Sequence, residues 1–464
     1  MKNIKSLKLF AFIIAGVMLF AACTQVNKPE EPVVNEEVNE AEKNKNETEE
    51  PDIEKPDEKT EDDETNKDEE AEKPSSGDFD LTTSEVLVQP EEVPAEDGLY
   101  QNEITKAMNA FASSTVPKLI KDSEENEIYS PISLYYALSM IREMADGQTL
   151  ANLNEHLNAN GIDISEELRK FTMTQKFNEG LLVNNSYWID NKYKDNANPE
   201  LLNVLKDKFY AYAFSTDFAA DGAYTDIDNW ALKTTNNMIE YNSKDMFGSP
   251  DIVSVILNAV YYESKWQSEF DAANNFTEKF HNLDGSETDA EFMTQVIDSG
   301  VYSKGEEYNS ALMRMESGNI YYILPKEGST PSDLLETENF IDEYLKTEFI
   351  AGKLTLNLPK YEVESTFSEL IQDLGLTDVF GPKADLSKAF VDDSQAFSIG
   401  QIIQKAKVIV DEKGAKASAV TGGIGTTSAP NPDKELELNL NRPFMYIITS
   451  NRGDVLFVGT VNKL

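Results

Sequence analysis

The chain has 464 residues, but it contains few of the side chains that usually perform chemistry. It has one cysteine, Cys23, and two histidines, His156 and His281, which stand far apart. A single cysteine permits no intramolecular disulfide and no cysteine-rich zinc site. No segment matches a nucleophile elbow, a phosphate-binding loop, a zinc-protease helix or an EF-hand loop. The glycines at 422–425 lack the spacing of a nucleotide-binding loop. We therefore expect no enzymatic activity, no metal site and no cofactor.

The stretch with a specific chemical use is Val408–Pro443. A β-branched run is followed by Asp411-Glu412-Lys413-Gly414 and then by a segment that could form a strand. If it did, one face of that strand would carry only small side chains. These are Ala415, Ala417, Ala419 and Thr421. Such a segment can enter between two existing strands without collision, and Lys416 then points outward. The Gly, Ser and Pro residues at 422–432 predict an exposed, protease-sensitive loop. The alternative is an ordinary surface loop of small residues.

Acidic charge is concentrated in one part of the chain. The formal net charge is −43, and about half of it lies between Thr24 and Asp97, where 28 acidic and 7 basic residues occur. That segment has too little apolar surface to offset its conformational entropy, so we expect a disordered tether over 23–97. The remainder, 98–464, is also acidic, which argues against nucleic-acid partners.

The N-terminus predicts export and attachment. Lysines at 2, 5 and 8 precede an apolar run, Leu9–Phe20, and Ala21-Ala22-Cys23 follows, which is typical of a secretory signal. The end of this signal resembles a bacterial lipobox, although Phe20 stands where Leu is more usual. The resemblance implies that 1–22 are a lipoprotein signal peptide and that Cys23 is lipidated. The protein would then be extracytoplasmic, anchored to the bacterial cell membrane, and in contact with the membrane only through its lipid. The alternative is an ordinary signal peptide with an incidental cysteine.

The elements that must position the loop are helices early in the chain and strands later. Apolar residues recur at helical spacing over 132–145, and Ser130 is a plausible N-cap. Strands are expected at Val253–Tyr262, Leu354–Leu358, Phe444–Thr449 and Val455–Val461. The last two flank a turn that contains Arg452-Gly453-Asp454, which also matches an integrin-binding tripeptide. This order favours one α+β domain.

Several motifs occur in the order found in one family. They are Asn126 with Tyr129–Leu134, Gly147-Gln148-Thr149, Leu257–Tyr262 with Lys265-Trp266 and Phe270, Leu358–Tyr361, Leu374–Leu376 with Val379-Phe380, Ala384–Ser387, Asp411–Gly414, and Asn441–Phe444 with Leu456–Gly459. In these motifs the chain resembles a serpin. The resemblance implies a serpin domain over 98–464 with three β-sheets, about eight or nine helices and an exposed reactive-centre loop. It also implies a monomer.

The function implied by the resemblance is that of a suicide substrate. A serpin traps an extracellular serine protease, or alternatively a cysteine protease, as an acyl-enzyme while its reactive loop inserts into the central β-sheet. The family interval places the reactive bond at Ser428-Ala429, with Thr427, Pro430 and Asn431 as alternatives. A small residue before the bond favours an elastase-like or subtilisin-like target over a trypsin-like one. The alternative is a non-inhibitory serpin that acts as an anchored binding or structural module.

The resemblance also assigns roles around the loop. The hinge consists of Glu412, Gly414, Ala415, Ala417, Ala419 and Thr421. The residues expected where the central sheet parts are Ser130, Ser133, Asn258 and Gln404, with Trp266 and Lys360 at the entry of the loop. An ion pair between Lys360 and Glu412 is expected there. Gln404 replaces the histidine that the family usually has, and Gln cannot titrate near neutrality.

Overall fold

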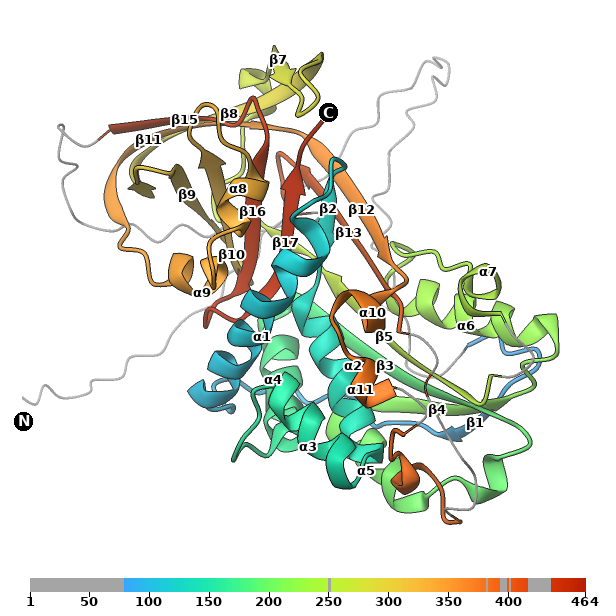
Figure 1. Ribbon diagram of the computed structural model, residues 1–464. Helices are drawn as coiled ribbons and strands as arrows, with labels where there is room; N and C mark the ends of the chain where they lie inside the picture. The colour runs from blue at the N-terminus through green and yellow to red at the C-terminus, as the bar shows by residue number, and fades with distance from the viewer. Residues whose placement is uncertain (1–78, 249–251, 381–382, 393–398, 400–401, 416–434) are drawn as a thin grey trace, which may run out of the picture. The chain divides into compact units, whose positions relative to one another are not determined.

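The computed structural model describes residues 79–464 apart from five internal segments, namely 249–251, 381–382, 393–398, 400–401 and 416–434. By its internal contacts the chain divides into Met1–Glu69 and Glu70–Leu464, and every described residue belongs to the second unit. Helices and strands are mixed in this unit, and the strands form three sheets (Figure 1). The α+β class and the three sheets expected from the sequence are therefore confirmed.

Eleven α-helices are described, and four of them have only four or five residues. The expected number of eight or nine helices therefore lies between the total of eleven and the seven longer helices. They are α1 Asn102–Ile120, α2 Pro131–Met144, α3 Gly147–His156, α4 Ile164–Asn178, α5 Pro199–Phe209, α6 Asp221–Thr234, α7 Ser243–Phe247, α8 Pro331–Leu335, α9 Phe340–Leu345, α10 Leu370–Asp373 and α11 Thr377–Phe380. The helix predicted over 132–145 is α2, and the hydroxyl of its N-cap Ser130 accepts a hydrogen bond from Ser133 N. None of the described helices has both the length and the hydropathy needed to cross a bilayer.

Two of the sheets have four strands each, and the third has nine. The first is ordered β1 (Glu85–Val88), β4 (Ala211–Thr216), β3 (Leu181–Asp190), β5 (Ser254–Tyr262). The second is ordered β12 (Tyr361–Phe367), β13 (Gln404–Asp411), β14 (Gly414–Ala415), β6 (Ser264–Lys265). The third is ordered β15 (Glu435–Asn439), β11 (Ile350–Pro359), β8 (Glu287–Lys304), β9 (Tyr308–Met315), β10 (Gly318–Pro325), β16 (Phe444–Ser450), β17 (Val455–Val461), β2 (Glu127–Tyr129), and β7 (Phe276–His281) pairs with β8. All four predicted strands are present, as β5, β11, β16 and β17.

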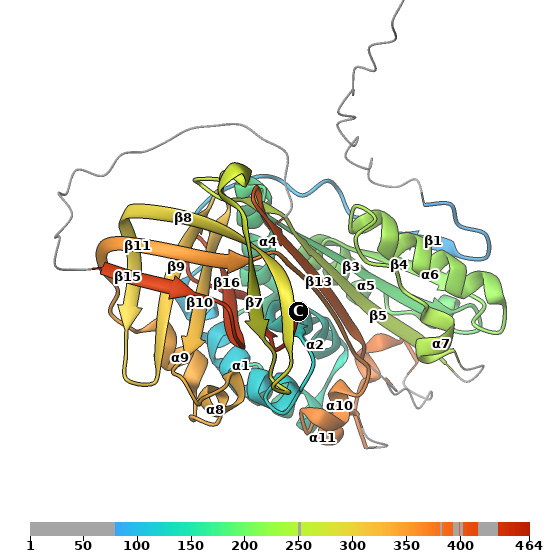
Figure 2. The same ribbon diagram turned by 90° about the horizontal axis from the view of Figure 1, so that it is seen from above.

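The two smaller sheets meet along the line between β5 and β13, which we call the parting. At one end β14 lies between β13 and β6, and β6 continues β5 after the single residue Glu263. Elsewhere in the described part of the chain no strand pairing joins β5 to β13, although the two run side by side (Figures 1 and 2). Both strands thus keep an edge that has no strand partner. Such an edge can pair with a further strand.

Alternate residues along the parting face two different apolar clusters, as the pleat of a strand requires. Val260 of β5 and Ala406 of β13 point into the main core, which also contains α2, α4 and α5. Leu257 and Ala259 of β5 point the other way and belong to a second cluster with Trp230 of α6. Helix α6 therefore covers the outer face of β3, β4 and β5.

Residues 79–88, which we call the strap, are bound to the edge of the first sheet and to α6. Strand β1 pairs antiparallel with β4. The carboxylate of Asp226 on α6 is fully buried and accepts hydrogen bonds from the backbone nitrogens of Thr82 (2.7 Å), Thr83 (2.8 Å) and Ser84 (2.8 Å). The Thr82 hydroxyl donates a fourth bond, of 2.9 Å, to the same carboxylate.

The apolar end of the strap packs just as closely. The ring of Phe79 meets that of Tyr212 edge to face at 5.1 Å. A Cβ atom added to Gly222 would lie 2.0 Å from Thr83 Oγ1, so the strap crosses α6 where only glycine leaves room. The expectation of a tether over 23–97 is wrong for its last part, because residues 79–88 belong to the fold. The sequence-based domain boundary at residue 98 lies too late in the chain.

We predict that Asp226→Asn destabilises the fold by about 2 kcal/mol, because a buried amide cannot accept all the bonds that the carboxylate accepts. Burial raises the pKa of Asp226, but the strap amides that donate to it outweigh burial and bring the pKa below its ordinary value. The measurement is the urea midpoint of unfolding at neutral pH. The control is Asp221→Asn on the same helix, where the carboxylate is exposed and pairs with Lys244. Equal midpoints for the two variants would contradict the role assigned to the strap.

Candidate functional site

The loop leaves the sheet at the end of β13 through a tight turn. Asp411 Oδ1 accepts hydrogen bonds from the backbone nitrogens of Lys413 (2.8 Å) and Gly414 (3.3 Å), which closes the turn. The chain then reverses into β14, where Ala415 pairs with Val410 of β13. On its other side β14 pairs antiparallel with β6. Gly414 and Ala415 of the expected hinge therefore already form a short strand between β13 and β6.

Gly414 is required at this position by both conformation and space. Its φ of +148° lies in a region that favours glycine. A Cβ atom at this position would lie 2.4 Å from Ser264 O and 2.6 Å from the Cα of Lys265. The expected hinge glycine is thus the residue that allows the turn to approach β6 so closely.

Trp266 fixes the turn from the side of β6. This side chain is 2% exposed, and its indole nitrogen donates to Asp411 O at 2.9 Å. Its backbone nitrogen donates to Lys413 O at 3.1 Å. Trp266 therefore contacts both ends of the turn, as expected for a residue at the entry of the loop.

The expected ion pair between Lys360 and Glu412 is present, with 2.7 Å between Nζ and Oε1. Lys360 also pairs with Glu291 at 3.0 Å, and Asn275 Nδ2 donates to both carboxylates, at 2.6 Å to Glu412 and 2.8 Å to Glu291. Burial raises the pKa of Glu412, but Lys360 and Asn275 outweigh it, so the net shift is downward. The hydrogen bond to Glu412 raises the pKa of Lys360. Both groups are therefore held in their charged forms. Sequence reasoning missed Asn275 and Glu291, because no motif marks either residue.

Three of the four residues expected where the sheet parts are hydrogen-bonded to one another. Gln404 Oε1 accepts from Ser130 N at 2.9 Å, and Gln404 Nε2 donates to Ser130 O at 2.8 Å. Ser133 N donates to Ser130 Oγ. Asn258 instead donates to Asn185 Oδ1 across the β3–β5 pair, at 2.6 Å. All these side chains are buried.

The remaining predicted site residues lie outside the described residues. They are Cys23, Ala417, Ala419, Thr421, Thr427, Ser428, Ala429, Pro430 and Asn431. Their roles in lipidation, insertion and cleavage stay predictions.

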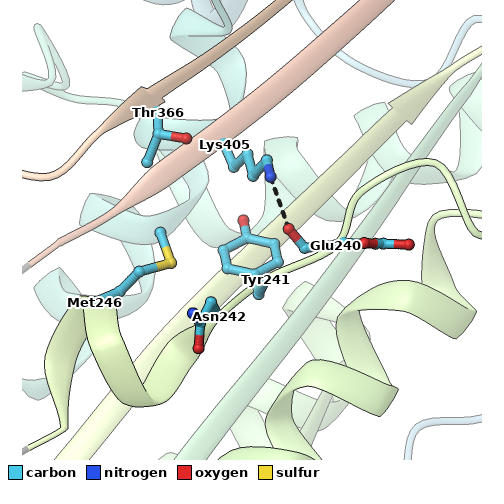
Figure 3. A pocket seen from close by; sticks show the side chains of 6 residues that line it. All are labelled: Glu240, Tyr241, Asn242, Met246, Thr366 and Lys405. Carbon is cyan, nitrogen blue, oxygen red and sulfur yellow. Dashed lines mark hydrogen bonds between the residues drawn. The ribbon is translucent and has the colours of Figure 1, made fainter.

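A cavity of about 360 Å³ lies over the parting, at the opposite end of β13 from the turn (Figure 3). Its lining consists of Glu240, Tyr241, Asn242, Met246, Thr366 and Lys405. The Lys405 amine donates to Glu240 O at 2.8 Å and pairs with Glu364 at 2.6 Å. Lys405 thus connects β12 and β13 with the segment that precedes β5, a link across the parting that the sequence did not indicate. The described residues contain no cluster of three or more side chains suited to a metal ion.

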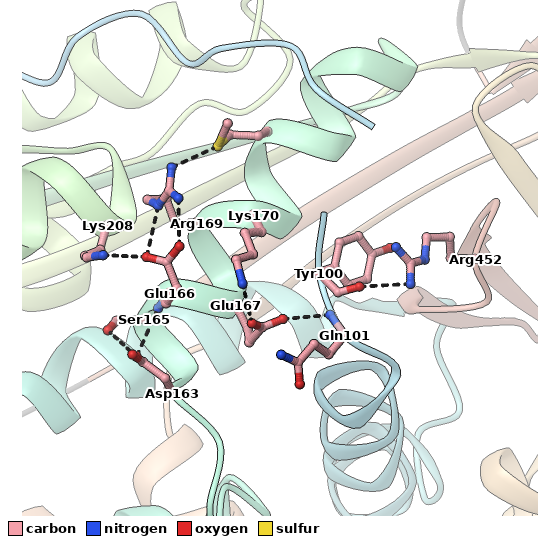
Figure 4. Close-up of polar contacts among 11 residues, drawn as sticks. Tyr100, Gln101, Asp163, Ser165, Glu166, Glu167, Arg169, Lys170, Lys208 and Arg452 are labelled. Carbon is pink, nitrogen blue, oxygen red and sulfur yellow. Dashed lines mark hydrogen bonds and ion pairs between the residues drawn. The ribbon is translucent and has the colours of Figure 1, made fainter. Parts of the chain in front are cut away.

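The Arg452-Gly453-Asp454 tripeptide lies in the turn between β16 and β17, as the sequence predicted. Figure 4 shows its Arg452 beside Tyr100. The carboxylate of Asp454 is fully buried and accepts bonds from the hydroxyls of Tyr100 (2.5 Å) and Thr105 (2.7 Å). The Arg452 guanidinium lies over the Tyr100 ring, 4.0 Å from its centroid. The tripeptide is therefore committed to packing against α1 and is not displayed.

Figure 4 also shows the ion pairs of Glu166 and Glu167 on α4. Glu166 pairs with Arg169 at 2.7 Å and with Lys208 of α5, and their hydrogen bonds lower its pKa to about 2. Glu167 pairs with Lys170 and accepts from Gln101 N, at 2.8 and 2.7 Å. These contacts join α4 to α5 and to the residue before α1.

Comparison with known proteins agrees with this geometry. The family model described as serpin (serine protease inhibitor) matches residues 106–464. Iripin-5 of Ixodes ricinus is 28% identical over 384 residues, which cover 79% of this chain and 96% of that protein. Neuroserpin of Gallus gallus is 28% identical over 370 residues, covering 73% and 86%. The native state of tengpin, a thermophilic serpin, superposes with a TM-score of 0.70 at 25% identity, covering 82% of this chain and all of that one.

We predict that Gln404→His makes stability depend on pH in the neutral range. A protonated imidazole has two donors and no acceptor, so Ser130 N would lose its partner and a charge would be buried. Burial lowers the pKa of such a histidine, so stability should be unaffected above about pH 6.5 and should fall as the pH drops below it. The measurement is the urea midpoint at about pH 8 and pH 5.5 for both proteins. A difference between variant and wild type that is the same at both pH values would contradict the prediction.

Proposed function

The chain belongs to the serpin family, and from this membership we propose that it is a single-use inhibitor that traps its target by inserting the reactive loop. Serpins are protease inhibitors rather than enzymes. In the proposed sequence of events, the nucleophile of the protease attacks the carbonyl of Ser428, the bond to Ala429 breaks, and the acyl-enzyme forms. The loop then enters the parting before water can hydrolyse the acyl bond.

The observation that carries this proposal is the position of β14. Gly414 and Ala415 pair antiparallel with β13 on one side and with β6 on the other, so the strand that would grow along the parting has already begun. The edges of β5 and β13 beyond it have no strand partner within the described residues. Extension of β14 would supply backbone hydrogen bonds to both edges at once, which gives insertion its driving force.

The length of the loop suits displacement of a bound protease. Fourteen residues, Ala415–Ser428, span roughly 46 Å at about 3.3 Å each when extended. A protease attached to Ser428 would therefore be carried about the length of a domain. Distortion of its active site during this transfer would stop the second half of its reaction.

The target class follows from the residues around the proposed bond. Ser428 is small and uncharged, which suits the shallow pockets of elastase-like and subtilisin-like serine proteases. A trypsin-like protease needs Arg or Lys at this position. Thr427, Pro430 and Asn431 remain alternative positions for the bond, and a bond at one of them would change this assignment of the target class.

We also propose that the inhibitor acts outside the cytoplasm, on the surface of a bacterial cell. The support is the N-terminal sequence, in which a signal-like apolar run ends at Ala22-Cys23. Two or three acyl chains on Cys23 would hold the protein stably, whereas one would not. The acidic segment that follows would place the inhibitor at some distance from the bilayer.

The first test is to mix the full chain with elastase-like, subtilisin-like and trypsin-like proteases. With the elastase-like and subtilisin-like proteases we expect a covalent complex that survives denaturing electrophoresis. With the trypsin-like protease we expect no inhibition. N-terminal sequencing of the released fragment should give Ala429 as its first residue. A protease whose nucleophile has been removed is the control and should form no such complex. Cleavage of the loop with full residual protease activity would contradict the proposal and would favour the anchored binding module.

The second test places the same bulky charge on either face of the hinge. Ala417→Arg should convert the inhibitor into a substrate, because residue 417 would face the core once inserted. Ser418→Arg is the matched control, because residue 418 would face outward, and it should trap at nearly the wild-type level. The measurement is the number of inhibitor molecules consumed per protease trapped. If both variants trap equally well, the assignment of faces is wrong.

A further inference from the structure

Strand β15 is the element at which the chain re-enters the described fold after β14. Its residues Glu435–Asn439 pair in parallel with Lys353–Asn357 of β11, and Leu436 and Leu438 are buried. Within the described residues its other edge has no strand partner, and Figure 2 shows β15 at the margin of the third sheet. Parallel ladders are slightly less stable per residue than antiparallel ones. Contacts outside this ladder therefore matter for keeping β15 in place.

Glu278 of β7 supplies such contacts at the C-terminal end of β15. Asn439 Nδ2 donates to both carboxylate oxygens of Glu278, at 3.1 and 3.0 Å, and Asn441 Nδ2 donates to Glu278 Oε1 at 3.1 Å. The backbone nitrogen of His281 also donates to Asn441 O, at 2.8 Å. Strand β7 pairs antiparallel with β8 along its whole length. Glu278 therefore ties the end of β15 to the interior of the sheet by a route that does not pass through β11.

The carboxylate of Glu278 is committed to this contact. The residue is half-buried, and among the described residues its carboxylate bonds only to the amides of Asn439 and Asn441. The neighbouring Lys279 lies on the opposite face of β7 and pairs with Asp289 of β8 at 2.8 Å. Hydrogen bonds to a charged acceptor are stronger than those between neutral groups. The three bonds to Glu278, which we call the clamp, are therefore a substantial part of what holds the end of β15.

The contacts at the other end of β15 are more exposed. Lys353 Nζ lies 3.4 Å from the Glu435 carboxylate, and both side chains are open to solvent. The Lys304 amine donates to Glu435 O, also at an exposed position. Ion pairs at exposed positions contribute little to stability, because water and salt screen them. The clamp at Glu278 is therefore the contact whose loss should weaken the attachment of β15 most.

The chain between β14 and β15 is attached at both ends, and this limits what the uncleaved protein can do. The unpaired edges of β5 and β13 favour a longer β14 whether or not the chain is cut. A strand that ran the length of β13 would draw in the chain that follows and pull on β15. Cleavage removes this restraint, and release of β15 from β11 would remove it without a cut. The contacts of β15 therefore decide how long the uncleaved chain keeps its loop outside the parting.

We propose that Glu278 is a positioning residue that keeps β15 on β11 and thereby reserves loop insertion for the cleaved chain. This inference rests on the proposed inhibitory function and deepens it. The bonds of Asn439 and Asn441 to Glu278 break before β15 leaves, so they add to the barrier for insertion of the uncleaved loop. The clamp acts on the rate of this change, and it preserves the inhibitor in its active form until a protease cuts it.

The test uses the full chain with Glu278→Ala and Glu278→Gln, incubated without protease at a temperature well below unfolding. Samples taken over time are assayed for trapping of an elastase-like protease and for the thermal midpoint of unfolding. Glu278→Ala should lose trapping roughly ten-fold faster than the wild type, the scale expected for losing hydrogen bonds to one charged group. Its midpoint should rise over the same period, because the inserted loop completes the ladder. Glu278→Gln should lie between the two, because its carbonyl oxygen still accepts from both amides.

Asp289→Ala is the matched control, because Asp289 pairs with Lys279 on the same hairpin and has no bond to β15 among the described residues. It should lose trapping at the wild-type rate. A merely structural role for Glu278 would lower the midpoint from the start and would not raise it during incubation. That result, or equal rates for Glu278→Ala and the wild type, would overturn the inference while fresh wild type still trapped protease. If fresh wild type traps no protease, the proposed function fails, and the change of the midpoint with time, which needs no protease, decides the inference.

Discussion

The structure depends on two strand edges that meet without pairing. Strands β5 and β13 run side by side, yet within the described residues only β14 and β6 join their sheets, at one end of the parting. Backbone groups at such edges are strong hydrogen-bonding groups, and a continuous ladder would satisfy them better than the present arrangement does. The parting is therefore a place where the fold can still gain stability. This unpaired pair of edges is the physical basis of the proposed insertion of the loop that starts in β14.

The contacts around the parting hold the two halves while leaving room for movement. At the end of the parting where β14 lies, the turn that precedes β14 is held by Trp266, Lys360 and Glu412. Further along, Gln404 is hydrogen-bonded to Ser130, the N-cap of α2, rather than to Asn258 across the parting. At the far end, Lys405 links β13 to the segment before β5. These contacts lie at separate points along the parting, and the proposed insertion of the loop would have to replace them.

Much of this arrangement could be predicted from local sequence. The N-cap at Ser130 and the β-branched run of β5 each depend on neighbours in the chain. The strap could not be found this way. Residues 79–88 look like the end of an acidic tether, and they are ordered by Asp226, which lies about 140 residues away. The same holds for Asn275 and Lys405, whose partners come from distant segments and carry no sequence motif.

The most direct test of this account is calorimetry on the intact chain and on the chain cleaved once in the loop between residues 422 and 432. If the parting stores the stability described above, cleavage frees the loop to complete the ladder, and the cleaved protein should unfold at a markedly higher temperature than the intact one. An unchanged or lower unfolding temperature after cleavage would show that the loop does not enter the parting, and would contradict the account.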